Sequence, residues 1–106
     1  MAKYLIQGSY TLEGVKGIVK DGGTARVAAA AKAVESLGGK LDVMYFTLGS
    51  DDVLGIMDVP DNVSAAALSL AVGAAGGVAL RTTVLLTPEE MDQAAKRAVS
   101  YSPPGG

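Results

Sequence analysis

The side chains that could do chemistry in this chain are three tyrosines, an arginine and an aspartate. Tyr4 and Tyr10 lie in one strand-like run and share its alternation, and Gly8 between them leaves room beside the two phenols. Together with Tyr45, and with Arg26 at the mouth, they predict a pocket for a flat or acidic small molecule. The alternative is that these tyrosines fill the core and satisfy their hydroxyls there.

Arg26 belongs to the run Gly22-Gly23-Thr24-x-Arg26, where a helix is expected to begin. Backbone N–H groups at a helix start, together with Arg26 and nearby lysines, can hold an anionic group. The alternative is a glycine break followed by a Thr24 cap, with Arg26 paired to Glu13 or Asp21. The spacing of a phosphate-binding loop is missing, so nucleotide hydrolysis is not expected.

Asp52 is the aspartate, and it lies with Asp51 and Asp58 around a central turn. Two such carboxylates can share a proton or hold a hard cation. The alternative is turn chemistry, in which Asp51 and Asp52 bond nearby backbone groups. Asp52 shares strand parity with Leu54 and Ile56, which directs its side chain towards a covered face. We expect no bound metal.

Composition narrows the possible functions. The 106 residues contain no histidine and no cysteine, which excludes disulfides, thiol chemistry and histidine-ligated metal or haem sites within the chain. The net charge is −2, with both signs interleaved, so no nucleic-acid partner is expected. Apolar runs fall short of a membrane span, and no signal peptide begins the chain, so we expect a cytoplasmic protein without a cofactor.

Periodicity and turn residues predict an α+β fold. Thr11 and Thr24 are expected to cap the first two helices. The expected strands are 3–10, 40–48, 52–59 and 78–86, and the expected helices are 12–20, 25–37, 63–75 and one that begins at 87–90. This order gives a ferredoxin-like βαββαβ unit with a four-stranded antiparallel sheet, plus a C-terminal helix. Residues 1–100 form one domain, and 101–106 form an extended Pro/Gly tail.

The sheet is predicted to be apolar on both faces. In the second strand Leu41, Val43 and Tyr45 alternate with apolar residues of the opposite parity, and in the third strand Leu54 and Ile56 do the same. A sheet that is apolar on both faces must be covered on both, but the main helices suffice for one face. We therefore predict a homodimer, or a higher homo-oligomer, through the helix-free face.

Several motifs resemble those of the GYD-domain proteins. The similarity is specific in two segments, 11–26 and 46–61. The matching residues are Tyr10-Thr11-x-Glu13-Gly14-x-Lys16-Gly17, Lys20-x-Gly22-Gly23-x-x-Arg26, Phe46-x-x-Gly49-x-Asp51-Asp52 and Asp58-x-Pro60-Asp61. The chain departs from the family at one point, because Asp51 stands where the family usually has tyrosine.

The resemblance implies a dimeric α+β barrel made from two ferredoxin-like sheets. Relatives in that superfamily include cofactor-independent monooxygenases, isomerases, decarboxylases, haem-degrading enzymes and ligand-sensing domains. It implies no particular activity for this chain, because fold alone does not give function. We expect a small-molecule-binding protein or an assembly module. The alternative is a cofactor-independent enzyme that acts on a small aromatic or acidic molecule.

Overall fold

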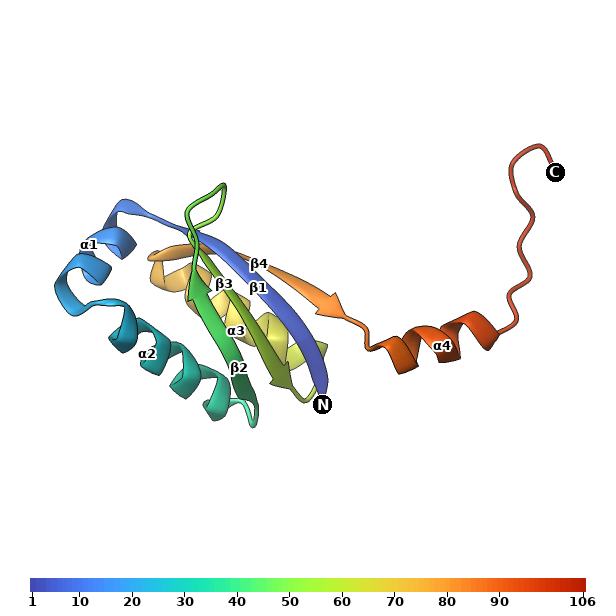
Figure 1. Cartoon of the computed structure of the whole chain (residues 1–106), viewed down its shortest axis with the longest axis horizontal. Coiled ribbons are helices and arrows are strands. Elements are labelled where there is room, and N and C mark those ends of the chain that lie inside the picture. The colour runs from blue at the N-terminus through green and yellow to red at the C-terminus, as the bar shows by residue number, and fades with distance from the viewer.

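A computed structural model describes all 106 residues of the chain. It confirms the α+β fold and the ferredoxin-like order of elements (Figure 1). The elements are β1 (Ala2–Tyr10), α1 (Leu12–Asp21), α2 (Gly23–Ser36), β2 (Lys40–Phe46), β3 (Val53–Val59), α3 (Asn62–Ala75), β4 (Val78–Leu85) and α4 (Pro88–Lys96).

The four strands form one open antiparallel sheet in the order β2-β3-β1-β4. Helices α2 and α3 cover the same face of this sheet (Figure 1). The core lies between that face and the two helices, where Tyr4, Met57 and Val59 are almost completely buried beside Val34 of α2 and Leu68 of α3. Burial of these side chains fixes which face of each central strand the helices cover.

The caps of the helices follow the sequence closely, with one exception. Thr11 accepts a hydrogen bond from the N–H of Gly14 at the start of α1, and Asp61 caps α3 in the same way through Ser64. The prediction that Thr24 caps α2 is wrong. Gly22, with φ +84°, is the N-cap, and the helix begins one residue earlier than Thr24. A glycine can adopt this positive φ without steric cost, so the chain can turn directly from α1 into α2.

The expected faces of β2 are also partly wrong. A β-bulge between Leu41 and Val43 adds one residue to the strand, and the alternation reverses there. Leu41 therefore lies opposite Met57 on the helix side, whereas Val43 and Tyr45 lie opposite Ile56 and Leu54 on the other face.

The helix-free face carries an apolar band with charged groups at both ends. The band consists of Leu5, Val43, Tyr45, Leu54 and Ile56, which neighbour one another through the strand register. At one end Lys3 donates to Asp42 at 2.7 Å and to Asp58 at 2.9 Å. These hydrogen bonds raise the pKa of Lys3, the one donated to Asp42 most strongly, and that hydrogen bond also lowers the pKa of Asp42. At the other end Arg81 pairs with Asp51.

Helix α4 and the tail after it project away from the sheet (Figure 1). The radius of gyration is 17.0 Å, whereas a compact domain of this length has about 13 Å. All residues of α4 are exposed, so this helix has no packing partner in its own chain. None of the helices has the length and apolar character needed to cross a membrane.

Candidate functional site

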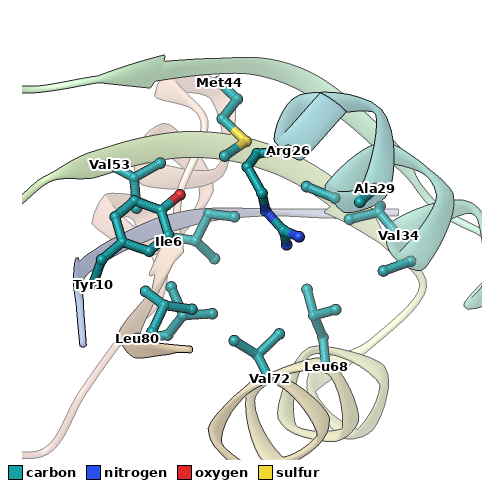
Figure 2. Close-up of a pocket in the computed structure, with 13 residues that line it drawn as sticks. Ile6, Tyr10, Arg26, Ala29, Val34, Met44, Val53, Leu68, Val72 and Leu80 are labelled. Atoms are coloured by element: carbon teal, nitrogen blue, oxygen red, sulfur yellow. The ribbon is translucent and has the colours of Figure 1, made fainter. Parts of the chain in front are cut away.

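An apolar hollow of about 120 Å³ lies between α2, α3 and the sheet. Twelve of its thirteen lining residues are hydrophobic. They come from every strand and from both covering helices: Ile6, Tyr10, Ala29, Ala30, Ala33, Val34, Met44, Val53, Leu68, Val72, Val78 and Leu80. Arg26 is the thirteenth. Figure 2 shows how these side chains surround an open centre between the two helices.

Arg26 is the only charged residue of the hollow. It projects from the first turns of α2, and its guanidinium points towards the middle of the ring of apolar side chains (Figure 2). The pairings with Glu13 or Asp21 that the sequence allowed are not formed, and Glu13 instead lies 3.9 Å from Lys16. Arg26 makes no ion pair within the chain. Its side chain is exposed, so water solvates the charge and an anion can replace that water.

Tyr10 supplies the second polar group of the hollow. It is the last residue of β1, and its ring stacks on Phe46 with the centroids 6.5 Å apart. Burial raises the pKa of the Tyr10 phenol. The nearby Arg26 charge lowers this pKa, and the Asp52 carboxylate raises it further. The phenol therefore stays protonated at neutral pH and presents a hydrogen-bond donor next to the cation.

Asp52 positions Tyr10 and does not line the hollow. Its carboxylate accepts a hydrogen bond from the backbone N–H of Tyr10 at 2.9 Å, and its own N–H donates to the carbonyl of Gly8 at 2.8 Å. Asp51 instead pairs with Arg81, and Asp58 pairs with Lys3. The three aspartates thus have separate partners, and the structure gathers no group of three or more acidic residues that could hold a metal ion.

Of the five candidate site residues, only Tyr10 and Arg26 line the hollow. Tyr4 is buried deeper in the core, where its hydroxyl donates to Asn62 at 2.5 Å. Tyr45 lies on the helix-free face and is 64% exposed. The space expected beside Gly8 is filled, because a Cβ there would lie 2.7 Å from the carbonyl oxygen of Ala79.

The mouth of the hollow opens towards α1. A second hollow of about 320 Å³ shares Tyr10, Arg26, Val72 and Val78 with the first and is otherwise lined by Glu13, Gly14, Gly17, Ala75 and Gly77. Hydrogen bonds from Thr11 to two backbone carbonyls hold the walls of this second hollow together. The N–H of Thr11 donates to the carbonyl of Gly77 at 3.0 Å, and the Thr11 hydroxyl donates to the carbonyl of Gly76 at 2.7 Å.

Sequence reasoning missed the apolar lining of the site. No residue type among Met44, Leu68 and Val72 indicates a binding site, because apolar residues on helices and strands are typical of a protein core. The four-residue spacing of Leu68 and Val72 is typical of one face of a helix. In the structure Leu68 belongs to the hydrophobic core and Val72 packs against it, and both residues also line the hollow, which their residue types do not indicate.

The comparisons with known proteins give one match. The family model described as GYD domain matches residues 4–95, which include every residue that lines the hollow. No curated protein and no solved structure matches the chain.

Proposed function

The chain belongs to the GYD domain family, and we propose that it is a small-molecule-binding protein whose hollow between α2 and α3 takes a compact apolar acid. The observation that carries this proposal is the guanidinium of Arg26, which has no ion-pair partner and is aimed into an otherwise apolar ring. A protein-bound cation in such surroundings gains most from a ligand that brings its own negative charge.

The size and lining of the hollow define the body of the ligand. An engineered apolar cavity of about 150 Å³ binds benzene, and this hollow measures about 120 Å³. The apolar part is therefore a single ring or a short branched chain. Aliphatic side chains from α2, α3 and the sheet would contact it on all sides.

Arg26 and Tyr10 define the head of the ligand. A guanidinium offers parallel N–H donors that match the two oxygens of a carboxylate. The protonated Tyr10 phenol adds a donor on the same side of the hollow. Both groups are shared with the mouth, which lets a ligand keep its acidic group near solvent while its apolar body lies inside.

We further propose that the protein works as a homodimer through its helix-free face. Burial of about 300 Å² of the apolar band from each copy contributes roughly 15 kcal/mol at about 25 cal/mol per Å². Association costs about 4–15 kcal/mol, so the band supports a dimer of modest affinity. The ion pairs of Lys3 and Arg81 lie at the two ends of the band, where a polar rim belongs.

The test is an NMR titration with phenylacetate, using phenylacetamide as its neutral analogue. At about −0.5 kcal/mol per non-hydrogen atom, phenylacetate should bind with a Kd of roughly 0.1–1 mM. It should shift the amide signals of α2, α3 and Tyr10. In the variant Arg26→Met the Kd for phenylacetate should rise about 10- to 100-fold, because charge-assisted hydrogen bonds are lost, while phenylacetamide binding should not change. Equal binding of the acid and the amide by the parent protein would refute the proposed role of Arg26.

A further inference from the structure

Two short helices at opposite ends of the molecule each expose an apolar stripe. On α1 the stripe consists of Leu12, Val15 and Val19, which are 69%, 45% and 82% exposed. The spacing of three and four residues places them on one side of the helix. The opposite side of α1 carries Gly14, which contacts the backbone of Gly77 in the body of the protein.

Helix α4 carries the matching stripe. Met91, Ala94 and Ala95 fall on one side at the same helical spacing, and Met91 is 55% exposed. The helix has nine residues, and isolated helices shorter than about 12–15 residues are marginal in water. Its capping box at Thr87 and Glu90 specifies where it starts but provides no surface for the stripe to pack against.

We propose that α4 of one copy packs antiparallel against α1 of a second copy of this chain. The charges at the helix ends support this partner and this direction. Each helix has acidic residues in its first turn and a lysine in its last turn, Glu13 and Lys20 in α1, and Glu89, Glu90 and Lys96 in α4. Antiparallel pairing places the acidic start of α4 at the end of α1 that carries Lys20, and the end of α4 that carries Lys96 at the start of α1 that carries Glu13.

The shape of the molecule rules out contact between the two stripes within one chain, and a second copy offers the complementary stripe to each. The longest dimension of the chain is 58 Å, and α1 and α4 lie near its two ends (Figure 1), so the two stripes of one chain do not meet. A two-fold axis that runs across the strands brings the α1 end of each copy to the α4 end of the other. The two contacts are then equivalent and close the assembly as a dimer. The segment 86–106 alone offers about as many residues as the 20–30 that a standard interface takes from each partner.

The experiment measures a contact that can form only between copies. The chain has no cysteine, so the variant Gln93→Cys, on the side of α4 away from the stripe, takes a nitroxide spin label at one position without blocking the contact. This protein is left without isotope and mixed with the ¹⁵N-labelled parent chain, so that any broadened signal reports the other copy. We expect the amide signals of residues 12–21 to lose more than half of their intensity, and to regain it when the nitroxide is reduced.

Two exposed valines give a matched pair of variants. Val19→Glu should abolish the broadening of α1 and raise the dimer dissociation constant at least tenfold. Val63→Glu, at a valine of α3 that is 79% exposed, should leave both unchanged. The inference is overturned if α1 is not broadened, if only another surface is broadened, or if Val19→Glu has no effect. Phenylacetate binding does not depend on the contact between α4 and α1. The phenylacetate titration therefore tests the proposed function separately from the spin-label experiment.

Discussion

Replacement of Gly14 by alanine should destabilise the protein, although alanine is the better helix former. A Cβ at Gly14 would lie 1.9 Å from the carbonyl oxygen of Gly77. That oxygen is held in place, because it accepts a hydrogen bond from the N–H of Thr11 at 3.0 Å. The conflict is with backbone, so no side chain can rotate to relieve it, and α1 must move away from the body.

Gly17, one turn further along α1, provides the matched control. No atom lies within 4 Å of a Cβ at this position. Alanine there should show only the gain in helix propensity, which is about 0.8–1 kcal/mol. At Gly14 the same gain opposes an overpacking cost in the upper part of the usual range, about 2–3 kcal/mol, because the contact is very short and is made with backbone. We therefore expect Gly14→Ala to lower the free energy of unfolding by roughly 1–2 kcal/mol and Gly17→Ala to raise it by up to about 1 kcal/mol.

The measurement is urea and thermal unfolding of the parent protein and both variants, followed by circular dichroism. For a domain of this size, about 1 kcal/mol corresponds to a shift in Tm of about 4–8 °C, so the two variants should differ by ten degrees or more. The reasoning is refuted if both substitutions shift the Tm in the same direction. A stabilised Gly14→Ala variant would mean that α1 does not approach Gly77 as closely as the structure shows.

Four further predictions concern the caps, the hollow and the sheet. Asp61→Ala should lower the Tm. The hydrogen bond from the N–H of Ser64 lowers the pKa of Asp61, so the stabilisation by Asp61 is present above about pH 4 and is lost as the pH falls through the folded pKa. Asp61→Asn should not show this loss in acid unfolding. In a spectrophotometric titration Tyr10 should ionise above the ordinary phenol range, and Tyr10→Phe should remove that step. The same variant should bind phenylacetate several-fold more weakly. Ile56→Lys should give a monomer by light scattering, with the helical content unchanged, since it places a charge in the centre of the apolar band; a dimer of parent affinity would contradict that face as the interface. Ala30→Leu should fill the hollow and weaken phenylacetate binding at least tenfold without lowering the Tm, whereas Ala28→Leu, on an exposed position of the same helix, should leave binding unchanged.

The sequence was sufficient to predict the order and type of every element, because each helix and strand is bounded by residues with strong local preferences. Thr11, Asp61 and the Thr87-Pro88 pair mark helix starts, and Gly38 and Gly76 adopt the positive φ that ends α2 and α3. These preferences act over a few residues, so they can be read without knowing the fold. The expected bounds are therefore close to those observed.

The faces of β2 could not be predicted in the same way. At the bulge Asp42 lies opposite no single residue of β3, and the register between two strands is a property of the pair. Asp42 is also the residue that accepts the hydrogen bond from Lys3 of β1. This ion pair between β1 and β2 thus offsets the ladder hydrogen bond that is lost at the bulge. It cannot be predicted from either Lys3 or Asp42 alone.

The two polar residues of the candidate site could be predicted from residue chemistry. Arg26 and Tyr10 were recognisable because a cation and a phenol have few uses near a helix start and a strand end. Tyr4 and Tyr45 have the same side chain as Tyr10, but Tyr4 is buried at the far end of β1 and the bulge turns Tyr45 to the other face. Residue type therefore indicated the chemistry of the site, and three-dimensional position decided which residues share it.

The hollow itself depends on residues that appear purely architectural. Ala29, Ala30 and Ala33 give α2 its helical propensity and would also permit close packing of α2 against α3. In the structure these alanines line the hollow, because α2 lies over β2 while α3 lies nearer β4 (Figure 1). The small side chains leave the space between the helices open, and the long side chain of Arg26 extends into it (Figure 2). The same alanine-rich helix therefore leaves the apolar space and places the cation inside it, which is why substitution of Ala30 and substitution of Arg26 should impair binding for different physical reasons.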